Sequence, residues 1–427
     1  MQHRPAFPVQ SDTHADLGAR YAAVRAMTEF LTVPLGPEDQ CIQSMPDASP
    51  TKWHLAHTTW FFETVVLLQH ARGYRRFDER FAYLFNSYYE ALGPRHPRPS
   101  RGMLTRPTVD EVFAYRRHVD AAMREFAAGP ERKAAPGAID LIELGLHHEQ
   151  QHQELILTDI KHALSCNPLL PAYTPAQPDA VQSAPPLHWI EHAGGIVEIG
   201  HAGGGFGFDN EYPRHRALLR PYRLASRPVT CGEYRAFIAD GGYRRPEFWL
   251  SDGWAAVQAQ QWSAPLYWLT EQADAQPVFT LHGVKRLNDD EPVAHVSFYE
   301  AAAYAAWAGK RLPTEFEWEA AAANAPSHGR PFDPARPHPT VAEAGTGLVQ
   351  MFDSVWQWTR SSYDPYPGFR PYAGPTAEYN GKFMIGQLVL RGGSCATPTG
   401  HTRATYRNFF PPQARWQFSG IRLAEDA

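Results

Sequence analysis

The sequence predicts a two-domain α+β protein: a helical bundle over residues 1–166, a linker over residues 167–186 and an irregular α+β domain over residues 187–427. Helical periodicity dominates the first part of the chain, the linker NPLLPAYTPAQPDAVQSAPP is rich in proline, and short strands with many Gly and Trp follow it. A length of 427 residues suits two or three domains, and a hydrophobic fraction of 43% allows large cores.

The first domain is expected to contain four helices that form a four-helix bundle. Apolar spacing or a continuous apolar run places these helices near residues 17–31, 53–69, 109–126 and 139–162. The long Pro- and Arg-rich segment 85–108 separates the second helix from the third, and long ordered loops are often functional. In the second domain, helices are expected near Cys231, over 299–308 and after Thr314, which forms a capping-box pattern with Glu317.

Charge and cysteine usage exclude several classes of protein. A net charge of -5 argues against a nucleic-acid or anionic-membrane surface, and no apolar segment reaches the roughly 18 residues that span a bilayer. The first residues lack the apolar core of a secretory signal. Four widely spaced cysteines form neither a disulfide framework nor a thiolate zinc site, so we expect a reducing, cytoplasmic location.

The most informative motif is LGLHHEQQHQEL, in which His148 and His152 are four residues apart on a predicted helix. Side chains at that spacing lie on one helix face, and two imidazoles so placed can bind one metal ion. The motif WHLAH in the second helix offers His54 and His57 as a third ligand. Several histidines on two apolar helices favour a buried metal site over isolated core histidines.

The spacing alone does not select the metal, because three neutral imidazoles can hold Fe(II), Zn(II), Cu(II) or Ni(II). Three protein ligands leave open coordination positions, as a catalytic metal requires. His147 and Glu154 lie about 100° and 240° around the helix from His148, so we expect structural roles for both.

Both halves of the chain resemble one family. SPTKWHLAHTTWFFE and HHEQQHQE resemble the DinB-like domain of the ergothioneine-biosynthesis sulfoxide synthases (EgtB). The second half resembles the formylglycine-generating-enzyme fold, which is C-type-lectin-like, through FDNEYPRH, PVAHVSFYEAAAYAAWAGKRLPTEFEWE, DSVWQWT, LRGGS and YRNFF…FSGIRLA. The two domains in this order are far more specific than the histidine motif alone.

The resemblance implies an Fe(II) site held by His57, His148 and His152. It also implies O2-dependent joining of a thiol sulfur to the imidazole C2 of Nα-trimethylhistidine (hercynine), with a sulfoxide product that passes to a separate C–S lyase. Neutral imidazoles leave iron able to accept a thiolate, and the open positions admit the sulfur donor, O2 and the imidazole substrate.

The resemblance carries over further residues to the two substrates. Gln151 is expected to face the imidazole substrate, while Asn408 and Phe409 match positions that hold its carboxylate and trimethylammonium group. Arg98 and Arg101 match an Arg-x-x-Arg pair that binds the carboxylate of the sulfur donor, a group that suits the guanidinium fork. Without the resemblance, a solvated basic loop would be the preferred interpretation of the two arginines.

Tyr88 and Tyr89 are candidate proton or electron donors, which would direct the oxidant toward C–S bond formation instead of thiol dioxygenation. In some relatives the catalytic tyrosine comes from the C-terminal domain. Phe410 stands where relatives that resemble γ-glutamylcysteine users have an acidic residue. A phenyl ring cannot pair with the ammonium group of a glutamyl arm, so we expect free cysteine as the sulfur donor.

Four alternatives compete with this interpretation. A formylglycine-generating oxidase needs a cysteine pair near the C-terminal part of the fold, and Cys395 stands alone after GGS, which excludes it. A zinc-dependent DinB-type thiol S-transferase, a lectin-like binding protein with a structural metal, and the same fold with a γ-glutamylcysteine or selenosugar donor stay open.

Overall fold

The computed structural model describes residues 17–129, 135, 137–175, 182–269, 277–323, 325 and 329–427. The chain divides into two compact units. The first runs to Ile160 and includes Gly204–Phe206 and Ala373–Glu378; the second comprises Lys161–Gly203, Gly207–Tyr372 and Tyr379–Ala427. Residues 176–181 of the predicted linker lie outside the described residues, so the predicted domain boundaries stay predictions.

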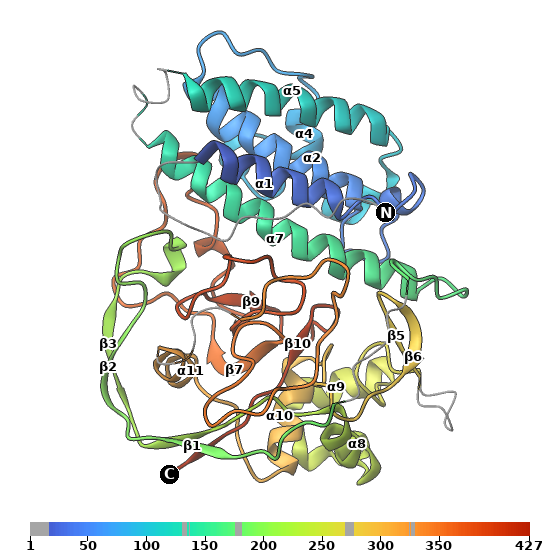
Figure 1. Cartoon of the computed structure of the whole chain (residues 1–427), viewed down its shortest axis with the longest axis vertical. Helices are drawn as coiled ribbons and strands as arrows, with labels where there is room; N and C mark the ends of the chain where they lie inside the picture. Colours follow the sequence, from blue (N-terminus) through green and yellow to red (C-terminus); the bar gives the residue numbers. More distant parts are fainter. Residues whose placement is uncertain are drawn as a thin grey trace. The chain divides into compact units, whose positions relative to one another are not determined.

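The first unit is helical (Figure 1). Its helices are α1 (Leu17–Phe30), α2 (Thr51–Phe61), the π-helical η2 (Phe62–Leu67), α3 (Leu68–His70), α4 (Phe81–Phe85), α5 (Val109–Ala128) and α7 (Ala138–Ser165), whose last residues belong to the second unit. The four predicted helices are therefore present, although their exact arrangement as a four-helix bundle stays a prediction. α4 is a short helix that the sequence did not predict.

The apolar positions that indicated helices α1 and α5 are buried, except for Val24 of α1. In α5, Val112, Val119 and Met123 are buried, and a capping box at Thr108 starts the helix. In α1, Val24 is only half-buried, and the buried position beside it is taken by Arg25. That exchange is possible because Arg25 has buried carboxylate partners.

The second unit combines short strands with short helices. Its helices are α8 (Cys231–Ala239), α9 (Ser251–Gln260), α10 (Phe298–Trp307) and α11 (Glu315–Ala322). Capping boxes at Thr230, Ser297 and Thr314 start α8, α10 and α11, which confirms the predicted Thr314–Glu317 pattern. Helix α9 was not predicted, because only Gly253 and Val257 are buried within it and the helical periodicity is correspondingly weak.

The strands form two small sheets and two hairpins. Strands β1 (Trp189–His192), β4 (Tyr222–Ala225) and β11 (Ala424–Asp426) form an antiparallel sheet in the order β1-β4-β11. Strands β10 (Ser419–Gly420), β7 (Trp356–Ser362), β8 (Leu388–Arg391) and β9 (Asn408–Phe410) form a second sheet in that order, in which only β10 and β7 are parallel. The hairpins pair β2 (Gly195–Ile199) with β3 (His215–Leu219), and β5 (Pro277–Thr280) with β6 (Gly283–Arg286).

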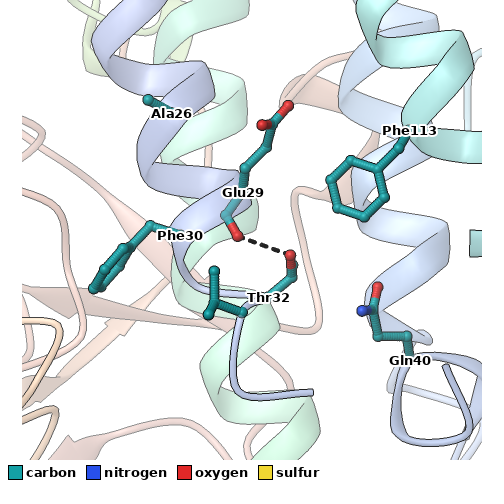
Figure 2. A pocket seen from close by; sticks show the side chains of 7 residues that line it. Ala26, Glu29, Phe30, Thr32, Gln40 and Phe113 are labelled. Carbon is teal, nitrogen blue, oxygen red and sulfur yellow. Dashed lines mark hydrogen bonds between the residues drawn. The ribbon is translucent and has the colours of Figure 1, made fainter. Parts of the chain in front are cut away.

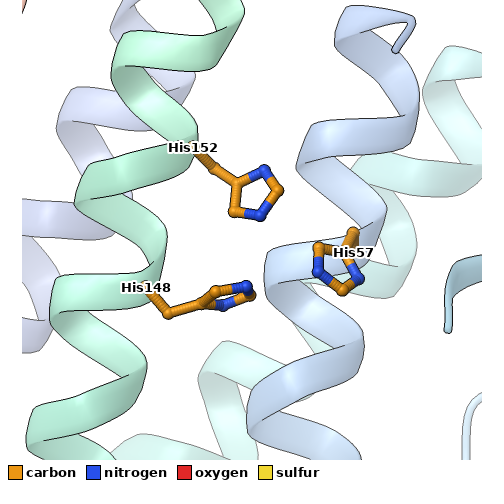
Figure 3. Close-up of side chains that lie close together, drawn as sticks. All are labelled: His57, His148 and His152. Atoms are coloured by element: carbon orange, nitrogen blue, oxygen red, sulfur yellow. The ribbon is translucent and has the colours of Figure 1, made fainter. Parts of the chain in front are cut away.

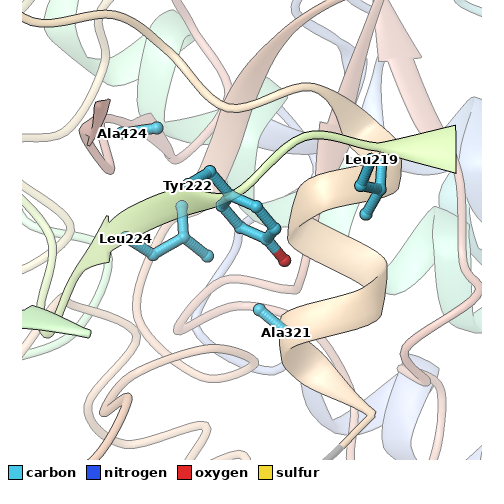
Figure 4. Packing of buried hydrophobic residues seen from close by; sticks show 5 residues of the cluster. All are labelled: Leu219, Tyr222, Leu224, Ala321 and Ala424. Carbon is cyan, nitrogen blue, oxygen red and sulfur yellow. The ribbon is translucent and has the colours of Figure 1, made fainter. Parts of the chain in front are cut away.

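Packing of β3, β4 and β11 against α11 forms one core of the second unit, made by Leu219, Tyr222, Leu224, Ala321 and Ala424 (Figure 4). The hydroxyl of Tyr222 donates a hydrogen bond to the Glu317 carbonyl at 2.8 Å, so the polar end of the ring is satisfied inside this core. Within the described residues, no helix has the length and apolarity that crossing a membrane requires.

Candidate metal centre

Helix α2 and the π-helical η2 that follows it are buried along their whole length, including their polar side chains. Every residue from Thr51 to Leu67 is buried, as the nearly continuous apolar run predicts. Trp53, His57 and Trp60 recur at four- and three-residue spacing and therefore share one face. The rings of Trp53 and Trp60 both stack on His57, with centroid distances of 4.5 and 5.6 Å, so the imidazole is held by a neighbour one turn away in each direction.

Three histidines from two helices converge at one point (Figure 3). His57 comes from α2, while His148 and His152 lie one turn apart on α7. Each offers one ring nitrogen, and the three nitrogens all lie within 4.8 Å of one another. This distance allows a single ion between them, and the predicted ligand set is brought together in one place.

Hydrogen bonding leaves a ring nitrogen of His57 available to a metal. Its Nδ1 donates to the carbonyl of Phe85 at 2.6 Å, which makes Nε2 the atom that carries the lone pair. Among the described residues that Nε2 is buried without a hydrogen-bond partner. A buried polar atom without a partner is costly, and a bound cation would satisfy it. The residues present therefore fit a metal ion.

All three imidazoles are held in the neutral form that binds metal. Burial lowers the pKa of His148 to about 3 and is also the main cause that depresses the pKa of His57 and His152 well below the usual range. Neighbouring imidazoles add to the depression at His57 and His152, because charging one ring disfavours charging the next.

Gly145 sets the close approach of α7 to the second helix. A Cβ atom at this position would lie 2.6 Å from Cε1 of Phe62 and 3.1 Å from Cε1 of Phe61. The Phe61 ring in turn packs against His148, with ring centroids 4.7 Å apart. A glycine one turn before His148 therefore leaves room for the Phe61 and Phe62 rings, of which Phe61 contacts the cluster.

A buried ion-pair network fixes α7 beside the cluster. Glu149, which follows His148, pairs with Arg25 of α1 at 2.9 Å and with Arg116 of α5 at 3.1 Å. Burial alone would raise the pKa of Glu149, but the two arginines outweigh it and lower that pKa to about 2. Because all three side chains are buried, removing one partner would leave an uncompensated charge in the core.

The candidate tyrosines lie close to the stacked rings. Tyr89 is completely buried, and its ring lies 5.6 Å from that of Trp60, which itself stacks on His57. Tyr88 is half-buried and stacks on Tyr89 with centroids 4.7 Å apart. A series of aromatic rings thus connects both predicted tyrosines with a predicted metal ligand.

Arg98 and Arg101 lie on one 3-10 helix, η4 (Arg98–Met103), in different environments. Arg98 is exposed and donates to the carbonyl of Asp47. Arg101 is buried, with its guanidinium carbon 3.3 Å from the ring centroid of Trp53. Burial, together with the positive charges of nearby arginines, lowers the pKa of Arg101 to about 8. An anion beside Arg101 would favour the charged form again.

The other predicted substrate residues belong to separate parts of the chain. Gln151 is half-buried on α7, directly before His152. In the second unit, Asn408, Phe409 and Phe410 form β9 and are all half-buried. Phe409 stacks on Tyr363 at 4.0 Å between centroids, and Phe410 meets Trp416 edge-on at 5.6 Å.

The first unit contains a pocket of about 440 Å³ (Figure 2). Its walls are formed by Ala26, Glu29, Phe30, Thr32, Val33, Gln40 and Phe113. None of the three clustered histidines lines it.

Comparison with known proteins agrees with this division of the chain. The DinB superfamily pattern matches residues 20–156, and the sulfatase-modifying factor enzyme 1-like domain matches residues 174–335 and 326–427. A hercynine oxygenase from Mycolicibacterium thermoresistibile is 34% identical over 89% of this chain and 88% of its own length. The chain belongs to the hercynine oxygenase family. The hercynine oxygenase of Mycobacterium tuberculosis is 32% identical over 96% of this chain and 98% of its own length.

Similarity also extends beyond the hercynine oxygenases. The formylglycine-generating enzyme of Streptomyces coelicolor is 28% identical over 55% of this chain and 88% of its own length. The predicted family and two-domain fold class are thus confirmed. The tryptophan pair around His57 was not predicted as part of the candidate metal centre, although the spacing W-x3-H-x2-W was visible in WHLAHTTW.

Proposed function

We propose that this chain is an iron(II)- and O2-dependent enzyme that joins the sulfur of cysteine to imidazole C2 of hercynine and forms hercynylcysteine sulfoxide. The observation that carries the proposal is the buried cluster of His57, His148 and His152, in a chain whose hercynine oxygenase relatives span nearly its full length. The product would pass to a separate C–S lyase in the cytoplasm.

The reaction balances with O2 as the oxidant. The imidazole C2–H and the thiol S–H bonds break, a C–S bond and an S–O bond form, and the second oxygen atom leaves as water. Iron held by the three imidazoles would supply the redox chemistry and a template for the reactants. The donor set fits that role, because neutral imidazoles suit iron and three ligands leave open positions.

The predicted substrate residues would bind and orient hercynine and cysteine. Arg101 offers a buried guanidinium for the carboxylate of cysteine, with Arg98 as a second, exposed cation on the same short helix. Gln151 precedes a ligand and would contact the imidazole of hercynine. Asn408 and Phe409 would bind its carboxylate and trimethylammonium ends, the latter through the attraction of a cation to an aromatic face.

Tyr88 or Tyr89 would donate a proton or an electron during oxygen reduction. Tyr89 is the better placed of the two, because only the ring of Trp60 separates its ring from His57 in the aromatic series. Burial of the phenol excludes bulk water, so a proton delivered there would come from the protein.

Metal content and O2 consumption test the proposal against a zinc-dependent thiol S-transferase. After anaerobic loading with Fe(II), Ala substitution of His57, His148 or His152 should each remove most bound iron and most activity. His54→Ala should lower the iron affinity without abolishing iron binding, because that residue contacts His152 but supplies no ligand nitrogen to the cluster. Loss of iron in His54→Ala with retention in His57→Ala would show that the α2 ligand is misassigned. Tight zinc binding without O2 uptake would favour the transferase.

A further inference from the structure

His54 lies between a metal-cluster histidine and a buried carboxylate. Its Nδ1 is 2.8 Å from Nδ1 of His152, and its Nε2 is 3.1 Å from Oδ2 of Asp159. All three side chains are buried, with exposed fractions of 2%, 9% and 5% for His54, His152 and Asp159. His152 and Asp159 are seven residues apart on α7, two helical turns along one face, so α2 places His54 against both at once.

The direction of these hydrogen bonds follows from Asp159. Its Oδ2 accepts the backbone N–H of Ser49 at 2.8 Å, so that oxygen acts as an acceptor. A carboxylate has no proton to donate, so Nε2 of His54 is the donor, and in a neutral imidazole ring the other nitrogen, Nδ1, is then an acceptor. Nδ1 of His152 must then carry the proton that it donates to His54, and the lone pair of His152 is on Nε2.

We propose that His54 and Asp159 are positioning residues that fix the tautomer and ring orientation of His152, so that its Nε2 is presented to the metal. The inference rests on the proposed metal centre. His57 has the same tautomer, with its proton on Nδ1, because its Nδ1 donates to the backbone carbonyl of Phe85 at 2.6 Å. Metal-bound histidines usually have such a partner on the second nitrogen, and here an imidazole stands between the ligand and the carboxylate.

Ser49 anchors the far end of this Asp159–His54–His152 chain. Its backbone N–H holds Asp159, and its hydroxyl accepts a hydrogen bond from Arg101 at 2.9 Å. Ser49 therefore contacts both Arg101, which would bind the carboxylate of the sulfur donor, and Asp159, which helps to orient the proposed metal ligand His152.

Cobalt(II) binding to the anaerobic full-length protein tests the positioning role without turnover. His54→Phe removes the acceptor for His152 and should weaken Co(II) binding by roughly 10- to 100-fold, with a changed Co(II) absorption spectrum. His54→Asn keeps an oxygen near the position of Nδ1 and should restore most of the affinity. His401→Phe is the matched control, because His401 is equally buried and hydrogen-bonds to Tyr406 in the other unit; its Co(II) affinity should equal that of wild type.

The tautomer can also be observed directly in the metal-free protein. In two-bond 1H–15N spectra of protein labelled with 15N-histidine, assigned with His152→Asn, His152 should carry its proton on Nδ1. A proton on Nε2 in wild type overturns the inference, even if His54→Phe fails to fold. Wild-type Co(II) affinity and spectrum in a folded His54→Phe variant also overturn it. If wild type itself binds neither Co(II) nor Fe(II), the proposed metal centre fails first and this inference fails with it.

Discussion

The indole of Trp53 stacks on the imidazole of His57, with ring centroids 4.5 Å apart and planes within 14° of parallel. Both rings belong to α2, one turn apart, so the helix itself orients a proposed metal ligand. The guanidinium of Arg101 lies over the same indole at 3.3 Å. Trp53 therefore contacts both the histidine cluster and the proposed carboxylate site, although it belongs to neither.

Trp53→Ala should lower the free energy of unfolding by about 3–5 kcal/mol, the usual cost of removing a large buried aromatic side chain. It should also weaken metal binding, because His57 loses a stacking partner. Chemical denaturation measures the first effect and Co(II) titration the second. Leu169→Ala is the control: this side chain is 86% exposed, so its removal should change stability by less than about 0.5 kcal/mol. Equal stability of wild type and Trp53→Ala would contradict the packing described for α2.

Lys161 should make the free energy of unfolding increase as the pH rises above about 7. Burial lowers its pKa from the ordinary value of 10.5 to about 7, and its Nζ lies 2.7 Å from Nε2 of His295. Between pH 7 and 10.5 the unfolded chain keeps this proton while the folded chain releases it, so the free energy of unfolding of wild type should rise with pH relative to Lys161→Met.

Denaturation of both proteins from about pH 7 to 10 measures that difference. Lys382→Met, at an exposed lysine, should show no such pH dependence relative to wild type. A constant difference between wild type and Lys161→Met over the whole range would show that Lys161 stays protonated when folded.

Tyr88→Phe or Tyr89→Phe should shift the product from sulfoxide toward cysteine sulfinate, because the oxidant then lacks its phenol donor. The larger effect is expected at Tyr89, which is completely buried, whereas Tyr88 is half-buried. The ratio of the two products, quantified by mass spectrometry, is the readout. An unchanged ratio in both single variants and in the double variant would place the proton donor elsewhere.

Free cysteine should be preferred to γ-glutamylcysteine as the sulfur donor. Phe410 packs edge-on against Trp416 and offers no acceptor for the ammonium group of a glutamyl arm. Leaving that charge buried without a partner would cost several kcal/mol. The values of kcat/KM for the two thiols, measured at saturating hercynine and O2, decide the matter. A clear preference for γ-glutamylcysteine would mean that another acidic residue replaces the one absent at Phe410.

Local sequence was enough to predict the long helices and to place His148 and His152 side by side, whereas the choice of His57 as the third proposed ligand came from the family resemblance. The periodicity of α5 and the apolar run of α2 determine which faces are buried, and the four-residue spacing of His148 and His152 places them on one face of α7. Helix spacing could not distinguish His54 from His57 as the third ligand. That choice depends on how far α2 is rotated against α7, which is a tertiary property.

Two other features could not be predicted from local sequence because they also depend on tertiary structure. The buried position of Arg101 beside Trp53 depends on the path of a Pro-rich loop, which has no periodicity to predict it. The π-helical segment Phe62–Leu67 is buried throughout, and a continuous apolar run does not distinguish a π-helix from an α-helix.

The most direct test of the central claim is the product of the reconstituted reaction. The protein is loaded anaerobically with Fe(II), hercynine and cysteine are added, O2 is admitted, and the products are identified by mass spectrometry. Wild type should form hercynylcysteine sulfoxide with consumption of O2, and the His152→Ala variant should not. Absence of a C–S-bonded product from folded, iron-loaded wild type with all three substrates present would contradict the account.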